Sequence, residues 1–127
     1  MNDELFNFAK RYAEAWSSQN PKSVAAFYAK GSSISVNGGT ATPIVEVVRG
    51  FMRDFPDMVV TFDKLETRPD GAAFHWTFTG TNTGPGGTGN RVLISGYELW
   101  KIDNDGLISE SKGHFDAADY ERQLKKK

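Results

Sequence analysis

In the second half of the chain, apolar and polar residues alternate in the way that is typical of long β-strands. Phe74, Trp76 and Phe78 take every second position and leave polar residues between them. This is the period of two expected when one face of a strand is buried. Three consecutive strands of this kind are predicted: Ala73–Thr83, Arg91–Ile102 and Leu107–Phe115.

The middle strand of this group is apolar on both faces. One face carries Val92, Ile94, Trp100 and Ile102, and the other carries Leu93, Tyr97 and Leu99. The helices of the chain cover only one of these faces, so the second face predicts contact with another subunit in a homodimer. Glu98 lies among the apolar residues of the first face. A carboxyl group at such a position forms an ion pair, is protonated and therefore neutral, or takes part in catalysis.

The first half of the chain follows helical spacing instead, with apolar residues recurring every three or four positions. Asn20 and Thr42 each precede a proline, which is a common start of a helix. Pro56 ends the last helical pattern, because proline supplies no N–H to a helix. Three helices are predicted: one from Leu5 to Trp16, a shorter one from Pro21 to about Lys30, and a third from Pro43 to Phe55.

Two further strands complete the predicted secondary structure, Ser32–Val36 and Met58–Thr67, and Asp116 is expected to cap a terminal helical turn. Since the long strands follow the helices rather than alternating with them, the pattern indicates an α+β protein. Long consecutive strands twist and curl. The sequence therefore predicts a curved antiparallel sheet wrapped around three helices, forming a cone with an internal pocket.

Composition narrows the functional classes. The chain has 127 residues, a net charge of −1 and no cysteine. The lack of a basic excess argues against nucleic acid as a partner, and the lack of cysteine excludes disulfides, thiol catalysis and thiolate metal sites. The histidines and acids show no ligand spacing, so we expect neither a metal nor another cofactor. The N-terminal segment is acidic and no apolar run could span a bilayer, so we expect a cytoplasmic protein without a membrane partner.

Five stretches carry a resemblance to a known family: Lys10–Trp16, Val24–Tyr28, Trp76–Gly84, Gly96–Ile102 and Asp105–Ile108. They resemble the nuclear transport factor two-like superfamily, and within it the SnoaL-like polyketide cyclases. The resemblance covers nearly the whole chain and implies one SnoaL-like domain over residues 1–127, with the cone-shaped α+β fold also called a cystatin-like roll. It commonly implies a homodimer packed through the outer sheet face. The superfamily includes isomerases, cyclases, dehydratases, hydrolases and binding proteins.

In the steroid isomerases of this fold, a tyrosine on the first helix and an acid on the penultimate long strand donate hydrogen bonds to a developing enolate oxygen. Tyr12 and Glu98 stand at the matching positions. A carboxyl among apolar residues has a raised pKa and can stay protonated as a donor. Those enzymes also use an acid on the first strand as general base, whereas Ser33–Asn37 contains no carboxylate. Glu98 could instead form an ion pair with Lys112 or Lys101.

The cyclase branch of the superfamily relies on an acid near the last strand, with a histidine nearby. The nearest candidates are Glu110, His114 and Asp116. Alternation within Leu107–Phe115 leaves two arrangements open. Either Glu110, Lys112 and His114 face the pocket, or Ser111, Gly113 and Phe115 do.

Together these observations predict a pocket for a small hydrophobic molecule. The candidate catalytic residues are Tyr12, Glu98 and His114, and the candidate substrate-binding residues are Trp16, Phe55, Phe74, Trp76, Phe78, Trp100 and Phe115. Two functions are consistent with such a pocket. One is cofactor-free acid–base catalysis of isomerisation, cyclisation or dehydration on a hydrophobic carbonyl compound. The other is a non-catalytic ligand-binding or dimeric interaction module that has lost the catalytic base.

Overall fold

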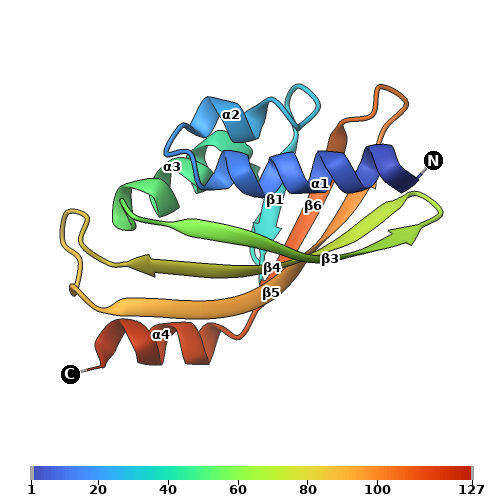
Figure 1. Cartoon of the computed structure of the whole chain (residues 1–127). Helices are drawn as coiled ribbons and strands as arrows, with labels where there is room; N and C mark the ends of the chain where they lie inside the picture. The colour runs from blue at the N-terminus through green and yellow to red at the C-terminus, as the bar shows by residue number, and fades with distance from the viewer. Residues whose placement is uncertain (1, 127) are drawn as a thin grey trace.

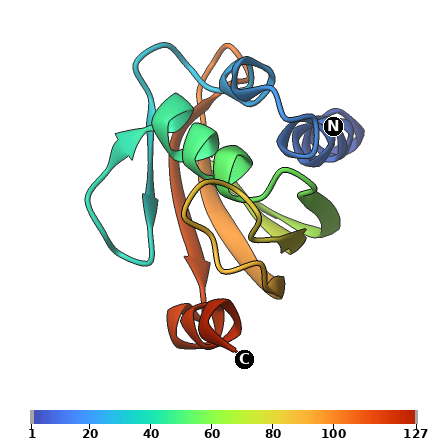
Figure 2. The ribbon, with the colours of Figure 1, turned by 90° about the vertical axis from the view of Figure 1, so that its left-hand side faces the viewer.

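The computed structural model describes the backbone of residues 2–126 and the side chains of residues 4–126. The helices are α1 (Asn2–Trp16), α2 (Pro21–Ala25), α3 (Ile44–Asp54) and α4 (Ala117–Lys125). The strands are β1 (Ser33–Val36), β2 (Thr42–Pro43), β3 (Val59–Arg68), β4 (Gly71–Thr81), β5 (Arg91–Ile102) and β6 (Ile108–Phe115). Helices α1, α2 and α3 lie on one side of a curved sheet, and α4 lies apart from them (Figures 1 and 2). The α+β class predicted from the sequence is confirmed.

One helix is shorter than predicted, and the terminal helix agrees with the prediction. Helix α2 ends at Ala25 because the chain leaves the helix to extend the sheet: the N–H of Ala29 donates to the carbonyl of Ile108 at 2.8 Å, and the N–H of Ile108 donates to the carbonyl of Phe27 at 2.9 Å. Helix α4 ends at Lys125, in agreement with the terminal helical turn expected through Tyr120 and Leu124. The side chain of Asp116 accepts a hydrogen bond from the N–H of Asp119, which confirms the predicted cap.

The sheet has the strand order β2-β1-β6-β5-β4-β3. Strands β3 to β6 form an antiparallel meander, as predicted. The prediction of an entirely antiparallel sheet is wrong at one edge, where β1 pairs with β6 in the parallel direction. The alternation of residues in a strand as short as β1 identifies its faces but carries no information on the direction of its neighbour.

Strand β5 has the two distinct faces that its sequence predicts. Val92, Ile94 and Trp100 are buried on the inner face, together with Glu98. On the outer face, Leu93 is 59% exposed and Tyr97 is 37% exposed. The inner face meets the three helices, so the side chain of Glu98 enters the interior of the cone.

Aromatic rings form the core between α1 and the sheet. Tyr12 contacts Phe74 and Trp100 edge-on, with ring centroids 5.2 and 5.1 Å apart, and Phe74 stacks on Trp100 at 5.0 Å. All three side chains are fully or almost fully buried. Such contacts give each ring one preferred orientation, and they hold the hydroxyl of Tyr12 over the inner face of β5.

Helix α4 covers a part of β5 that has no neighbouring strand on its β6 side. β6 pairs with β5 only from Gly96 onward, which leaves the backbone of Leu93 unpaired on that side. The side-chain amide of Gln123 fills this place: its Oε1 accepts from the N–H of Leu93 at 2.7 Å, and its Nε2 donates to the carbonyl of Leu93 at 2.9 Å. An open strand edge is thereby closed. No helix among the described residues combines the length and the apolar character needed to cross a membrane.

The contact between Gly96 of β5 and Trp76 of β4 allows a direct test of this packing. A Cβ atom at Gly96 would lie 2.3 Å from the carbonyl oxygen of His114 and 2.6 Å from a ring carbon of Trp76. We predict that Gly96→Ala lowers the free energy of unfolding by about 1–3 kcal/mol, the usual cost of overpacking a core, as measured by urea denaturation.

Gly50→Ala is the matched control. Gly50 lies inside α3, and a Cβ atom there would meet nothing within 4 Å. Alanine is the better helix former by about 1 kcal/mol, so this variant should be as stable as the wild type or more stable. Equal stability of the Gly96→Ala variant and the wild type would show that Trp76 does not pack over Gly96 as described.

Candidate functional site

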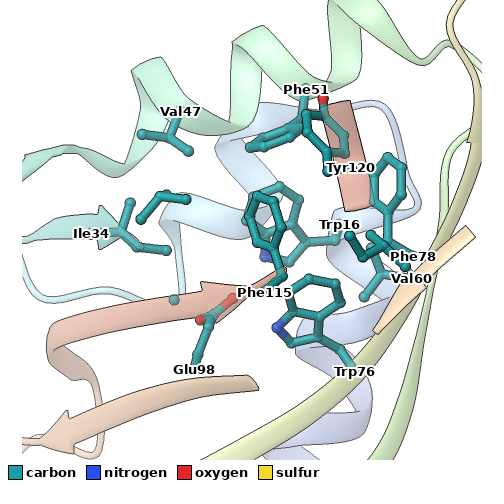
Figure 3. A pocket seen from close by; sticks show the side chains of 13 residues that line it. Trp16, Ile34, Val47, Phe51, Val60, Trp76, Phe78, Glu98, Phe115 and Tyr120 are labelled. Carbon is teal, nitrogen blue, oxygen red and sulfur yellow. The ribbon is translucent and has the colours of Figure 1, made fainter. Parts of the chain in front are cut away.

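An internal cavity of about 60 Å³ lies between the helices and the inner face of the sheet. Its walls are apolar apart from Glu98, the indole nitrogens of two tryptophans and the hydroxyl of Tyr120 (Figure 3). The lining residues are Trp16, Ile34, Val36, Val47, Phe51, Val60, Trp76, Phe78, Ile94, Glu98, Gly113, Phe115 and Tyr120. Cavities that bind benzene have volumes of roughly 150 Å³, so a ring of that size would require the walls to move apart.

The carboxyl group of Glu98 is held at one oxygen by three donors. Oε1 accepts hydrogen bonds from the hydroxyl of Tyr12 at 2.9 Å, from the indole N–H of Trp100 at 2.9 Å and from the hydroxyl of Ser111 at 3.0 Å. The hydroxyl of Tyr12 also lies 2.8 Å from that of Tyr28. Since Tyr12 donates to Glu98, Tyr28 donates to Tyr12. No donor among the described residues bonds to the other oxygen, Oε2, and the side chain lines the cavity.

Burial raises the pKa of the Glu98 carboxyl, while the hydrogen bonds from Trp100, Tyr12 and Ser111 act in the opposite direction and do not cancel the effect. Burial also raises the pKa values of Tyr12 and Tyr28 well above their ordinary value, and the nearby charge of Glu98 adds to the increase. Both tyrosines therefore keep their protons and remain hydrogen-bond donors. The site is neutral when Glu98 is protonated.

Among the described residues, Glu98 has no cationic partner. Lys112, one of the two partners considered from the sequence, instead lies 3.6 Å from Glu110 on the exposed side of β6. The register of the sheet explains this arrangement, because Glu98 is paired with Gly113 and the flanking side chains of β6 point to the opposite face. The ion-pair interpretation of Glu98 is wrong, and its three donors are all uncharged.

The structure brings Tyr12 and Glu98 together but gives Tyr12 a different place from the one expected. Its hydroxyl is directed at Glu98 Oε1, and the residue is fully buried and does not line the cavity. It is therefore not placed to contact a ligand there. Tyr12 orients and stabilises the carboxyl group, which makes it a positioning residue.

His114 lies on the outer face of the sheet, away from Tyr12 and Glu98. It is paired with Tyr97 across the strands and stacks on that ring, with centroids 5.0 Å apart. The alternation of β6 is thus settled: Ser111, Gly113 and Phe115 face the interior, while Glu110, Lys112 and His114 face outward. His114 does not belong to the cavity, and Asp116 caps α4 instead of entering the site.

Four of the predicted binding residues line the cavity and three do not. Trp16, Trp76, Phe78 and Phe115 form its walls. Phe55, Phe74 and Trp100 are core residues packed behind them. Apolar spacing identifies the buried face of an element but not the part of that face that meets a cavity, so the walls that α3, α4, β1 and β3 supply were not predicted. Ser111 and Tyr28 were likewise not predicted as parts of the hydrogen-bond network.

Two tryptophans that line the cavity have unpaired indole N–H groups. The Nε1 atoms of Trp16 and Trp76 are buried, and neither has a hydrogen-bond acceptor among the described residues. Trp100, which does not line the cavity, donates to Glu98. Within the described part of the chain, no group of three or more histidine or acidic side chains is arranged to hold a metal ion.

Comparison with known proteins identifies the family. The family model for the SnoaL-like polyketide cyclases matches residues 7–124. The chain belongs to this family. A comparison with curated proteins finds no significant sequence match.

Solved structures share the fold at low sequence identity. TsrD from Streptomyces laurentii superposes with a TM-score of 0.82 at 18% identity, over 98% of this chain and 97% of that protein. A protein with a ketosteroid isomerase-like fold from Catenulispora acidiphila, solved with trimethylamine, gives 0.79 at 14% identity, over 92% and 91%. The epoxide hydrolase/cyclase-like enzyme SalBIII gives 0.78 at 15% identity, over 94% and 97%. At these identities the similarity establishes the fold alone.

The buried carboxyl predicts an unusual pH dependence of stability. A raised pKa in the folded protein means that the stability contributed by this group is fully present below the unfolded pKa and is lost as pH rises through the folded one. Glu98→Gln retains an oxygen for the three donors and cannot ionise. We predict that the melting temperature of this variant exceeds that of the wild type by more at pH 8 than at pH 5. A difference of about 1 kcal/mol in stability corresponds to a few degrees.

Glu110→Gln is the control, because Glu110 lies on the neighbouring strand with its side chain 43% exposed. It should show no comparable gain at pH 8. A Glu98→Gln variant that is less stable than wild type at pH 8 and equal to it at pH 5 would show that the folded protein requires the ionised carboxylate.

Proposed function

We propose that this protein is a cofactor-free enzyme that transfers a proton to or from a small hydrophobic carbonyl compound, in an isomerisation, cyclisation or dehydration. Glu98 is the acid–base group. The observation that carries the proposal is the arrangement of its carboxyl: three donors hold Oε1, and the side chain lines an otherwise almost apolar cavity. Membership of the SnoaL-like polyketide cyclase family supports the same class of chemistry.

The hydrogen bonds decide which oxygen of Glu98 carries the proton. An oxygen that accepts three hydrogen bonds is unsuited to bear a proton, because that proton would compete with the donors for the same lone pairs. A protonated Glu98 therefore carries its proton on Oε2. Burial raises the pKa of the carboxyl above its ordinary value and so favours the protonated form. A group with such a pKa is effective in both giving and accepting a proton.

The second candidate function is binding without catalysis. Glu98 is the one carboxyl group among the residues that line the cavity. The segment Ser33–Asn37, where steroid isomerases of this fold hold their general base, contains no acid. A protein with this cavity could bind a hydrophobic ligand and leave it unchanged. The two functions differ in whether proton exchange occurs on the bound compound.

Deuterium exchange tests the catalytic proposal without knowledge of the product. An enzyme that moves a proton beside a carbonyl group also exchanges that proton with solvent. We predict that the wild-type protein in D₂O accelerates deuterium incorporation into at least one member of a panel of small cyclic and aromatic ketones, followed by proton NMR. Glu98→Gln should reduce this rate by about 100-fold or more, the usual contribution of a general acid–base group.

The Glu110→Gln variant should exchange the same ketone at the wild-type rate. A ketone that binds the wild-type protein but gains no deuterium above the uncatalysed rate would favour the binding function. Exchange that is equally fast in the Glu98→Gln variant would contradict the role of Glu98.

We also propose that the protein forms a homodimer through the outer face of the sheet. Leu93 and Tyr97 are exposed on this face, and Tyr97 lies between His75 and His114, with ring centroids 5.7 and 5.0 Å apart. Exposed apolar and aromatic residues on one continuous face are typical of a protein–protein contact. Val59, at 49% exposure, belongs to β3 at the far edge of the sheet.

Sedimentation equilibrium tests the dimer. We predict a dimer at tens of micromolar protein, because an interface of roughly 1,600 Å² holds at such concentrations. Leu93→Lys should shift the equilibrium to the monomer. Phe6→Lys is the control, since Phe6 is 52% exposed but lies on α1, and this variant should remain dimeric. A wild-type monomer at that concentration would refute the proposed dimer.

A further inference from the structure

We infer that the indole N–H groups of Trp16 and Trp76 are the hydrogen-bond donors for an oxygen of the ligand, and that this oxygen belongs to an uncharged carbonyl group. The inference deepens the proposed function and rests on it for the location of the ligand. It gives the two tryptophans the role that the family resemblance suggested for Tyr12, whose hydroxyl is occupied with Glu98.

The first reason is the cost of leaving these donors unpaired. Both Nε1 atoms are buried without an acceptor among the described residues. Native proteins rarely tolerate such groups, because each loses its hydrogen bonds to water and gains none in return. Trp100 provides the contrast within the same protein, since it lies outside the cavity wall and its indole N–H is paired with Glu98. Both unpaired donors belong to residues that line the cavity, and a ligand that moves the walls apart can supply the acceptor.

The second reason is position. Trp16 comes from α1 and Trp76 from β4, and both line the cavity that Glu98 also lines. The nitrogen atoms of the two rings lie on the side of Glu98, whereas Phe51 and Phe78 form the opposite side of the cavity (Figure 3). The cavity thus has a polar end with two N–H groups and a carboxyl, and an apolar remainder. A ligand with one oxygen at the edge of an apolar body matches this division.

The third reason is charge. No lysine, arginine or histidine lines the cavity. A carboxylate or phosphate would be buried there without a counter-charge, which is strongly unfavourable. A carbonyl oxygen needs no counter-charge and accepts two hydrogen bonds through its two lone pairs. The cavity therefore favours a neutral ketone or aldehyde over an anionic ligand.

These donors would also assist the proposed proton transfer. When the carboxylate form of Glu98 removes the proton beside the carbonyl group, the C–H electron pair forms the new C=C bond. The carbonyl π pair then moves onto the oxygen, and the proton ends on Oε2. Negative charge therefore grows on the oxygen that faces the two indoles. Donors that are already in place stabilise such a charge without reorganisation.

Indole NMR resonances of ¹⁵N-labelled protein test the inference directly. The chain has three tryptophans, and single Trp→Phe variants assign their Nε1–H signals. The probes are cyclopentanone and methylenecyclopentane, which have nearly the same shape but differ in the acceptor oxygen. We predict that cyclopentanone moves the Trp16 and Trp76 signals downfield and leaves the Trp100 signal nearly unchanged. Methylenecyclopentane should produce no downfield shift.

Binding constants of single variants supply the second arm. Trp76→Phe and Trp16→Phe each keep an aromatic wall and remove one donor, so each should lower the ratio of ketone to hydrocarbon affinity by about three- to tenfold. Phe78→Leu is the matched control, because Phe78 lines the same cavity without a donor. It should weaken both probes alike and leave the ratio unchanged.

Three results would overturn the inference. These are ketone binding without a downfield shift at either indole, an equal shift with the hydrocarbon, and no response to cyclopentanone at about 10 mM, where millimolar binding is detectable. The two proposals fail separately. Indole shifts without deuterium exchange would support this inference and refute catalysis. Deuterium exchange without indole shifts would support catalysis and refute this inference.

Discussion

The burial of one carboxyl group, that of Glu98, is the constraint on which the site depends. An ionisable group this far from water is tolerated only when it is neutral or well supplied with hydrogen bonds. The fold supplies the hydrogen bonds at one atom, Oε1. Donors from α1, β5 and β6 converge on Oε1, and Tyr28, just beyond α2, supports the donor from α1. Four separate parts of the chain are thereby fixed relative to one another by a polar contact inside an aromatic core.

The buried hydroxyls around Glu98 leave the proposed chemistry with one acid–base group. Burial raises the pKa values of Tyr12 and Tyr28 well above their ordinary value, and it raises that of Tyr120 in the cavity wall to about 12. None of these hydroxyls ionises near neutral pH. Glu98 is the one carboxyl group among the residues that line the cavity, and burial raises its pKa above the ordinary value. Reactions that require an acid and a separate base at the same time would need the ligand or solvent to provide the second group.

The sequence predicted the parts of this site that follow from long, regular patterns. The twelve residues of β5 alternate over their whole length, so the inward direction of Glu98 could be predicted. Its closeness to Tyr12 was implied by the family resemblance. β6 was different, because its inward residues Ser111 and Gly113 are no more apolar than the outward residues Glu110 and Lys112. Its orientation depends on the register with β5, which local alternation does not encode. For this reason His114 was predicted to belong to the pocket, although it lies on the outer face of the sheet.

The remaining errors have a related origin in tertiary contacts. Helix α2 ends early because Phe27 and Ala29 pair with the start of β6, a contact between segments that are distant in the sequence. The same pairing turns the chain so that Tyr28 faces Tyr12. Helical spacing alone gave no reason for the helix to stop before Lys30. The pairing of this segment with β6 thus explains both the early end of α2 and the position of Tyr28.

The cavity joins two kinds of wall, and each serves a different purpose. Trp76 and Glu98 stand on adjacent antiparallel strands, where backbone hydrogen bonds fix the distance between their side chains. Phe51 and Tyr120 come from α3 and α4, which are held mainly by side-chain packing and by contacts such as that of Gln123 with Leu93. These two strand residues therefore hold the carboxyl group and one indole of the polar end rigidly, as the proposed proton transfer requires. The second indole, that of Trp16, is held by α1. The helices shape the apolar end, so the size of an accepted molecule can vary while the position of the reacting group is preserved.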